Sequence, residues 1–202
     1  MKIALMVEGS TEKAFLPVLR NYLTPRLLGR MPKIDPVSYD GRIPKEARLK
    51  DEVCRLLGGK NPADAVIALT DVYTGSKEFV SAADAKNKMS KWVGKEPRFH
   101  PHVALHDFEA WLLPYWEAIQ KLAGSNLKSP GPDPEQVNHH SPPSFRIKEA
   151  FRTGDRGKRY SKIRDGLAIL RDQDLTRALS QCGELKALVN RILSLSGGQI
   201  IT

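Results

Sequence analysis

Two acidic residues, each directly after a short apolar run, are the best candidates for chemistry in this chain. Glu8 follows the run Lys2–Val7, and Asp71 follows the run Ala65–Leu69 after one threonine. Such runs predict buried β-strands, and side chains at the carboxyl ends of parallel strands converge on one crevice. Two carboxylates placed there repel each other unless a cation or a shared proton ties them. Mg²⁺ or Mn²⁺ suits the pair, because hard cations take carboxylate oxygens and keep waters for a phosphate substrate.

Five further residues are candidates, and three of them have a plainer alternative. Glu12 is either a second metal ligand or the acid of a helix capping box. Gly9 would let the backbone approach a ligand closely, and Tyr73 would either bind a phosphate or pack. Glu109 is either a metal ligand or an acid that favours the start of a helix. His106 would act as a proton donor, a phosphate donor or an orienting group.

One short segment carries most of the net charge. The chain has a formal charge of +9, and the stretch 145–164 holds eight lysines and arginines against two acids. A surface of this density attracts polyanions, although a solvated, solubilising face would have the same composition. Within it, Arg146, Tyr160 and Lys162 are candidate phosphate contacts, since arginine offers a bidentate fork and lysine a point charge. Nucleic acid is the expected partner.

Alternating strand and helix patterns must position these residues. They predict an α/β fold with a mostly parallel sheet of about four strands flanked by helices, followed by a C-terminal helical extension. The expected strands are Lys2–Val7, Ile34–Tyr39, Ala65–Leu69 and Arg98–Leu105. A first helix is expected through Phe15, Val18, Leu19, Tyr22 and Leu23, capped by Ser10 or Thr11. The other expected helices are Pro44–Leu57, Ser76–Val93, Phe108–Leu122, Lys162–Leu170 and Leu175–Leu195. We expect residues 1–123 to form the α/β domain and residues 124–202 to supply a basic loop and helices packed on it.

The composition bears on location and assembly. Apolar runs stay short of the roughly 20 residues that span a membrane, so no membrane partner is expected. Met1–Val7 lacks the charge and length pattern of a signal peptide. Cys54 and Cys182 stand alone, which favours a reducing, cytoplasmic location. The apolar tail Ala187–Ile201 would serve equally well as core or as the interface of a homodimer.

The acidic motifs resemble those of a known fold. Val7-Glu8-Gly9 with Glu12, and Thr70-Asp71-Val72-Tyr73, resemble the Toprim fold of topoisomerases, primases and OLD-type nucleases. More closely, the chain resembles the Toprim-related, RloG-like family found near restriction and phage-defence genes. This likeness also includes Gly75, the run His100–Trp111 with the motif His106-Asp-Phe-Glu109, and the tail residues Asn138, Pro143–Arg146, Tyr160–Lys162, Gly166 and Cys182.

The resemblance implies a Toprim-like sheet and a metal-dependent nuclease with an ATPase partner encoded nearby. It implies that Glu8, Glu12, Asp71 and Glu109 are metal ligands, with His106 beside them. A full Toprim site has an acid where this chain has Tyr73, which removes one carboxylate and puts two-metal catalysis in doubt. Glu109 would restore the acid count if its strand lies beside the others.

The sequence therefore supports three hypotheses about the function. The leading one is a Mg²⁺- or Mn²⁺-dependent endonuclease of the Toprim type, in which Glu8 and Asp71 act with Glu109 and His106. The alternative is a non-catalytic Toprim-like module that binds nucleic acid or a nucleotide and regulates, and Tyr73 is its main support. Asp71-Val-Tyr73-Thr74 also resembles, distantly, the Asp-x-Asp-x-Thr loop of haloacid-dehalogenase phosphatases, but the second acid and the first-strand position are both missing.

Overall fold

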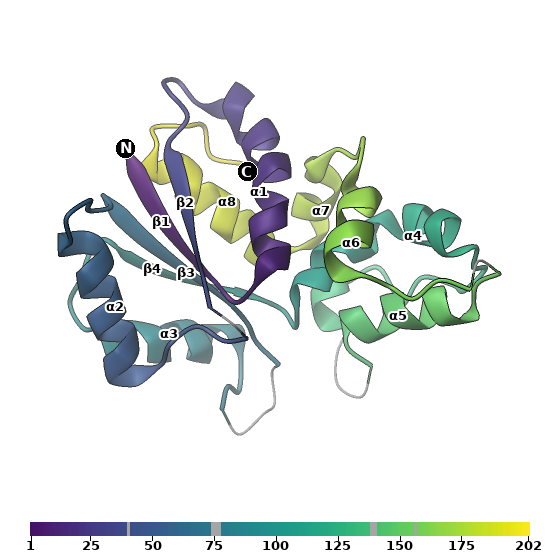
Figure 1. The fold of residues 1–202 in the computed structure, drawn as a ribbon. Helices are drawn as coiled ribbons and strands as arrows, with labels where there is room; N and C mark the ends of the chain where they lie inside the picture. The colour runs from purple at the N-terminus through teal and green to yellow at the C-terminus, as the bar shows by residue number, and fades with distance from the viewer. Residues whose placement is uncertain (40, 74–77, 138–140, 156) are drawn as a thin grey trace.

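A four-stranded, all-parallel sheet forms the centre of the computed structural model, which describes residues 1–39, 41–73, 78–137, 141–155 and 157–202 (Figure 1). Its strand order is β2-β1-β3-β4, with β1 and β3 in the middle. The strands are β1 (Lys2–Val7), β2 (Lys33–Ser38), β3 (Ala65–Asp71) and β4 (Phe99–Ala104). The predicted α/β class, with a mostly parallel sheet of about four strands and a C-terminal helical stretch, is confirmed.

The sheet is buried on both faces. In β1, Ile3 and Leu5 join one apolar cluster, and Ala4 and Met6, which alternate with them, join the other. A strand covered on both sides has a continuous apolar sequence, which is why β1 and β3 can be recognised from the sequence alone. The outer strands β2 and β4 contain Pro36 and Pro101, residues that sheets tolerate at their edges.

Helices form the outer layers of this fold. The helices α2 (Glu46–Gly58) and α3 (Ala82–Val93) share one apolar cluster with the sheet, and α1 (Ser10–Leu23) and α8 (Gly183–Leu195) share the other. The short helix η1 (Thr24–Arg26) follows α1. The two pairs of helices therefore sandwich the sheet.

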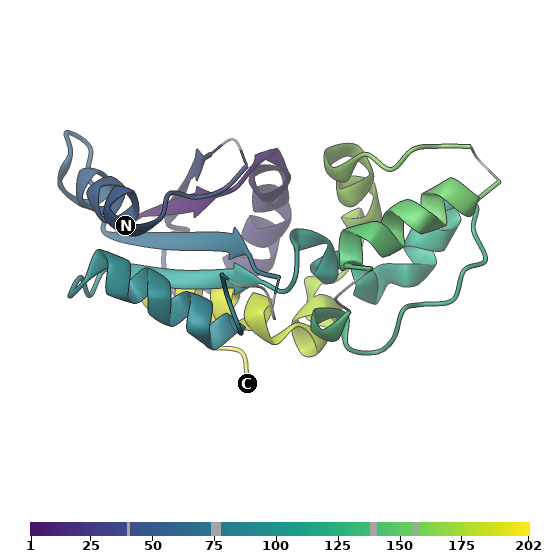
Figure 2. The same ribbon diagram turned by 90° about the horizontal axis from the view of Figure 1, so that it is seen from below.

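The remaining helices lie beyond the carboxyl ends of the strands (Figures 1 and 2). They share the apolar cluster of α1 and α8, so the sheet and this extension have a continuous core. Their bounds are η2 (Phe108–Tyr115), α4 (Trp116–Ala123), η3 (Pro134–Gln136), α5 (Pro143–Thr153), α6 (Lys162–Leu170) and α7 (Leu175–Gln181). The extension therefore faces the edge of the sheet at which the acidic motifs end.

Three helical boundaries differ from the sequence-based expectation. The expected helix Phe108–Leu122 is a 3-10 helix as far as Tyr115 and an α-helix from Trp116, a division that falls next to Pro114. The expected helix Leu175–Leu195 is interrupted at Cys182, where the backbone is extended. The basic segment, expected to be a loop at its start, begins with the helix α5.

Some expectations fall outside the described residues. The helix expected from Ser76 is described from α3 onward, while Gly75, Ser76, Asn138 and Arg156 belong to the undescribed positions. Within the described residues, no helix combines the length and apolar composition needed to cross a bilayer.

Candidate functional site

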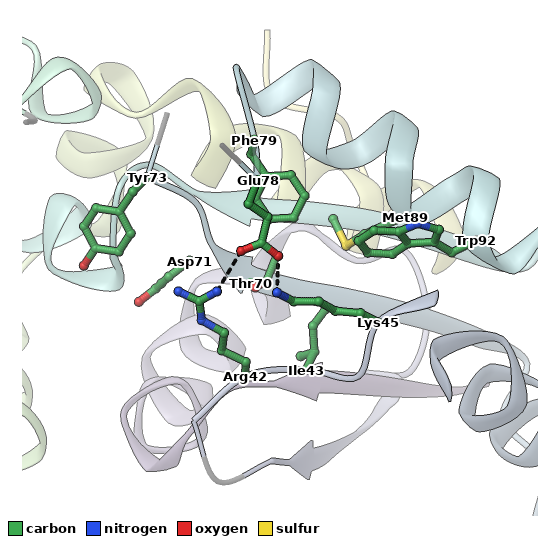
Figure 3. A pocket seen from close by; sticks show the side chains of 10 residues that line it. All are labelled: Arg42, Ile43, Lys45, Thr70, Asp71, Tyr73, Glu78, Phe79, Met89 and Trp92. Atoms are coloured by element: carbon green, nitrogen blue, oxygen red, sulfur yellow. Dashed lines mark hydrogen bonds and ion pairs between the residues drawn. The ribbon is translucent and has the colours of Figure 1, made fainter. Parts of the chain in front are cut away.

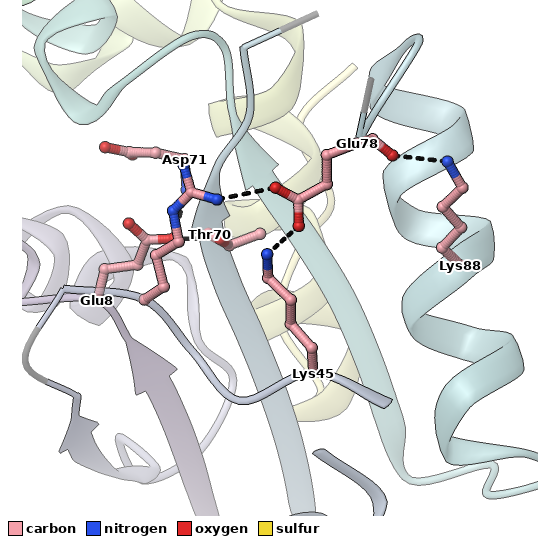
Figure 4. A network of polar contacts seen from close by, with 7 residues as sticks. Glu8, Lys45, Thr70, Asp71, Glu78 and Lys88 are labelled. Carbon is pink, nitrogen blue, oxygen red and sulfur yellow. Dashed lines mark hydrogen bonds and ion pairs between the residues drawn. The ribbon is translucent and has the colours of Figure 1, made fainter. Parts of the chain in front are cut away.

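The carboxyl ends of β1 and β3 bring Glu8 and Asp71 together. Glu8 directly follows β1, and Asp71 is the last residue of the neighbouring strand β3. The Glu8 carboxylate accepts a hydrogen bond from the backbone N–H of Asp71 at 3.2 Å and another from the Thr70 hydroxyl (Figure 4). Thr70, which the sequence did not single out, therefore fixes one oxygen of Glu8.

A second acidic pair comes from the segment after β4. Asp107 and Glu109 are both 0% exposed. One oxygen of Asp107 accepts hydrogen bonds from the Tyr73 hydroxyl and from the Ser144 N–H, both at 3.2 Å. Ser144 lies in the first turn of α5, an end of the helix that favours negative charge. Sequence reasoning does not identify Asp107 as a site residue, although its place directly after a strand and beside His106 is a signal for it.

Glu109 is neutralised by residues from the start of α6. Its carboxylate lies 3.1 Å from Lys162 Nζ and accepts a hydrogen bond of 3.4 Å from the Tyr160 hydroxyl. Three predicted site residues thus form one contact group between η2 and the start of α6. In this arrangement Lys162 has Glu109 as its acidic partner, and its predicted contact with a phosphate stays a prediction.

Burial and mutual repulsion shift the carboxyl groups in one direction. Burial raises the pKa of Asp71 well above its usual range, and the nearby charges of Glu8 and Asp107 add to the shift. Burial also raises the pKa of Glu8, and its two hydrogen bonds oppose this only in part. The pKa of Glu109 is raised by burial and by Asp107 despite the opposing charge of Lys162. We call Glu8, Asp71, Asp107 and Glu109 the acidic cluster, because their charges repel one another and Lys162 neutralises only part of the total.

Tyr73 and His106 line the same region. Burial, with Asp107 nearby, raises the pKa of Tyr73, so its hydroxyl stays a hydrogen-bond donor. The Tyr73 ring stacks on His106 with centroids 6.3 Å apart. His106 is buried, and its Nδ1 lies 3.2 Å from the carbonyl oxygen of Val72. A carbonyl can only accept, so Nδ1 is the donor in this hydrogen bond.

Oxygen atoms that could bind a cation are present here, but among the described residues they do not converge on one point. Asp107 has one buried carboxylate oxygen with no hydrogen-bond partner in the described chain. Carboxylate oxygens are the ligands that Mg²⁺ and Mn²⁺ prefer, and an unpartnered buried one is costly unless something satisfies it. Among the described residues, however, no group of three acidic, histidine or cysteine side chains already stands at metal-binding distances.

Two other predicted residues belong to a helix cap. Gly9 precedes α1 in an extended conformation, and its N–H donates to the Glu12 carboxylate at 3.2 Å. This is half of a capping box, the plainer of the two roles expected for Glu12. A Cβ at Gly9 would meet only ordinary contacts, so the structure does not require glycine there.

The predicted basic residues lie on and after α5. Arg146 is half-buried and pairs with Glu149 at 3.7 Å, and its Nε has no hydrogen-bond partner in the described chain. Beyond it, a cavity of about 450 Å³ is lined mainly by cations and two aromatic rings. Its lining residues are Lys148, Phe151, Arg152, Gly157, Lys158, Arg159 and Tyr160. Because Tyr160 also contacts Glu109, this basic cavity adjoins the acidic cluster.

Comparison with known proteins gives a family without an assigned activity. Residues 7–193 match the model of a family described as a domain of unknown function, DUF4276. This match includes the acidic cluster, α5 and nearly all of α8. Neither a curated protein nor a solved structure matches the chain.

Proposed function

The chain belongs to the DUF4276 family, and we propose that it is a divalent-metal-dependent hydrolase of phosphodiester bonds in nucleic acid. The observation that supports this most directly is the acidic cluster at the carboxyl edge of a parallel sheet, beside a cationic cavity. Four carboxyl groups with a single lysine among them attract a cation, and the basic cavity attracts a polyanion. Few activities other than phosphate chemistry need both together.

Within this proposal, the acidic residues have separate roles. Asp71 and Glu8 would hold Mg²⁺ or Mn²⁺, with Asp107 supplying its unpartnered oxygen. Such an ion supplies positive charge that polarises a phosphate and favours ionised water. Glu109, already paired with Lys162, would place the Lys162 ammonium at the edge of the cluster rather than act as a first ligand. Glu12 would stabilise α1 as a helix cap.

The remaining residues would orient the substrate. His106, whose Nδ1 donates to the Val72 carbonyl and whose ring stacks on Tyr73, would help to orient Tyr73 toward the substrate. The Tyr73 hydroxyl stays protonated and is held on Asp107, which suits a donor to a phosphate oxygen. Arg146 and the basic cavity beyond it would hold the strand.

The proposal also includes the expected relationship and setting. We propose a Toprim-type endonuclease, related to the RloG-like proteins of phage defence, that acts in the cytoplasm with a separately encoded ATPase. A homodimer is compatible with it. These statements depend on the resemblance of Glu8, Asp71 and the motif around His106.

One observation favours the non-catalytic alternative. In the described chain no three potential ligands converge, and Glu109 is neutralised by Lys162. A regulatory module that binds nucleic acid through the basic cavity would need neither three converging ligands nor a Glu109 left for a metal ion. Cleavage separates the two readings, because both would bind nucleic acid in a salt-dependent way.

The test is cleavage of single- and double-stranded DNA and RNA with Mg²⁺ or Mn²⁺ at low salt. We expect Asp71→Asn and Glu8→Gln to lower the rate at least 100-fold, whereas Asp51→Asn, an exposed control on α2, leaves it unchanged. Cleavage that survives both site substitutions would refute the assigned site. Salt-sensitive binding without cleavage, also after addition of the ATPase, would establish the regulatory reading instead.

A further inference from the structure

A second cavity, of about 290 Å³, opens beside the acidic cluster on the α2 and α3 side of the sheet (Figure 3). Its lining joins the end of β3, the loop before α2, and α3. Thr70, Asp71 and Tyr73 form the side nearest the acidic cluster. The other lining residues are Arg42, Ile43, Lys45, Glu78, Phe79, Met89 and Trp92.

One wall of this cavity is an anion-binding position that a carboxylate already occupies. Arg42 donates to Glu78 at 2.8 Å, and Lys45 contacts the other oxygen of the same carboxylate. Burial raises the pKa of Glu78, but Lys45 and Arg42 outweigh it and the net direction is downward. Glu78 is therefore an anion held by two cations, the arrangement that also binds a phosphate.

The occupant of that position is exchangeable. The Arg42 side chain is 63% exposed and that of Glu78 is 32% exposed. Ion pairs this open contribute little to stability, because water screens them. A phosphate carries up to two charges and more acceptor oxygens, so it would replace the single carboxylate at little cost.

The opposite wall is apolar and aromatic. Trp92 is half-buried on α3, Met89 of the same helix lies beside it, and the Phe79 ring lies 6.5 Å from that of Trp92. Figure 3 shows Met89 and Trp92 on the side of the cavity away from Asp71. Such a wall binds a flat, mostly apolar ring, and ligand pockets combine surfaces of this kind with a few polar groups.

Arg42 connects this cavity to the acidic cluster. Its guanidinium lies between Glu78 and Asp71 in Figure 3. Its charge also lowers the pKa of Glu8, a minor effect beside the burial that raises it. An anion bound to Arg42 would therefore sit next to the carboxylates that we propose for the cleavage reaction.

We propose that this cavity binds one nucleotide, with its phosphate in the place of Glu78 on Arg42 and Lys45 and its base against Trp92 and Met89. The size fits one such unit, since small-molecule pockets begin near 300 Å³. The inference rests on the proposed function in one respect, that the nucleotide is a unit of the strand to be cut. A free nucleotide has the same chemistry, and the experiment separates the two sources.

The test is isothermal titration calorimetry with dAMP in EDTA, so that neither metal nor cleavage is needed. We expect dAMP to bind at least tenfold more tightly than inorganic phosphate or deoxyadenosine. The double variant Arg42→Ala/Lys45→Ala should bind at least tenfold more weakly, and Glu78→Gln should bind three- to tenfold more tightly. Arg98→Ala and Glu96→Gln, which remove the two halves of another exposed ion pair, should change neither value.

Each contrary result overturns a defined part of the inference. Absence of dAMP binding, or binding that Arg42→Ala/Lys45→Ala leaves intact, refutes the cavity as the site. Phosphate that binds as tightly as dAMP refutes the role of the aromatic wall. Failure of the tetranucleotide d(A)4 to displace dAMP refutes the strand unit in favour of a free nucleotide. Because the assay is metal-free, it can succeed while cleavage fails, and the reverse.

Discussion

At the scale of single residues, the site is defined by acids that the fold brings closer together than their charges favour. Glu8 and Asp71 come from adjacent strands, and Asp107 and Glu109 come from the segment after β4. Burial and repulsion raise the pKa of three of them. Charge crowding of this kind costs stability, and carboxyl groups with shifted pKa values cluster at functional sites, which is why we place the proposed activity here.

Asp71→Asn should make the protein more stable at neutral and basic pH. The folded-state pKa of Asp71 lies above its unfolded value, so ionisation weakens the folded state as pH rises above about 4. The substitution removes that penalty, and its advantage should grow between pH 4 and 8. Urea midpoints of both proteins across this range measure it. Asp51→Asn should show no such trend, and equal stability of Asp71→Asn and wild type at pH 8 would contradict the prediction.

Lys162→Met should destabilise the protein by about 2 kcal/mol. Removing one partner of a buried pair leaves the other charge uncompensated, which costs roughly 3–5 kcal/mol when both are buried. Glu109 is 0% exposed but Lys162 is 44% exposed, which places the effect below that range. Chemical denaturation provides the measurement. Adding Glu109→Gln should restore most of the stability, and a double variant no more stable than Lys162→Met would show that the pair is not the cause.

At the scale of elements, the extension contains helices that approach one another very closely. Gly154 ends α5 beside the last residue of α4, Ala123. A Cβ placed on Gly154 would lie 2.1 Å from the Ala123 carbonyl oxygen, although its φ of −77° suits any residue. The glycine is therefore required by contact between two chain segments and not by its own conformation.

Gly154→Ala should consequently cost about 3 kcal/mol, the upper end of what overpacking costs. Gly58→Ala is the matched control, because a Cβ at the end of α2 meets nothing within 4 Å. There alanine should be neutral or stabilising by about 0.5–1 kcal/mol, since it restricts the unfolded chain. Thermal and urea denaturation of both variants compare them. Similar effects at the two positions would mean that helix propensity, not the close approach of α4 and α5, decides.

The elements also show what a single sequence can predict. β1 and β3 are recognisable because burial on both faces leaves continuous apolar runs, and with them the placement of Glu8 and Asp71. α5 is harder to recognise because its exposed face is densely charged, although Ile147, Ala150 and Phe151 have helical spacing. Arg42 has no local signal at all, because only the packing of its loop against the sheet brings it to Glu78.

At the scale of the whole molecule, the sheet edge and the extension give opposite charges to adjoining surfaces. The chain carries +9 overall, yet the acidic cluster lies where β1, β3 and β4 end. The cations gather instead around the basic cavity on and after α5. Under the proposed function, a strand bound there would have its phosphates facing the basic cavity on one side and the carboxylates on the other, with a metal ion between the carboxylates and a phosphate.

This arrangement predicts that the position of the positive charges affects nucleic-acid binding more than the net charge of the protein does. Replacing Lys148, Arg152 and Lys158 by glutamine removes three exposed cations of the basic cavity. Each cation that no longer neutralises a phosphate lowers the slope of log K against log salt by about 0.7–0.9, so the slope should fall by about 2. Fluorescence anisotropy with a labelled oligonucleotide, measured at salt concentrations of about 50–200 mM, gives this slope.

The matched control removes the same charge elsewhere. Glutamine at Lys33, Lys60 and Lys95, all exposed and at or shortly before the amino ends of β2, β3 and β4, the sheet edge opposite the acidic cluster, also lowers the net charge by three. Charges more than a Debye length of about 10 Å from the strand are screened, so this variant should keep the wild-type slope. Equal decreases in the two triple variants would mean that net charge alone attracts nucleic acid, and the basic cavity would then have no special role in holding the strand.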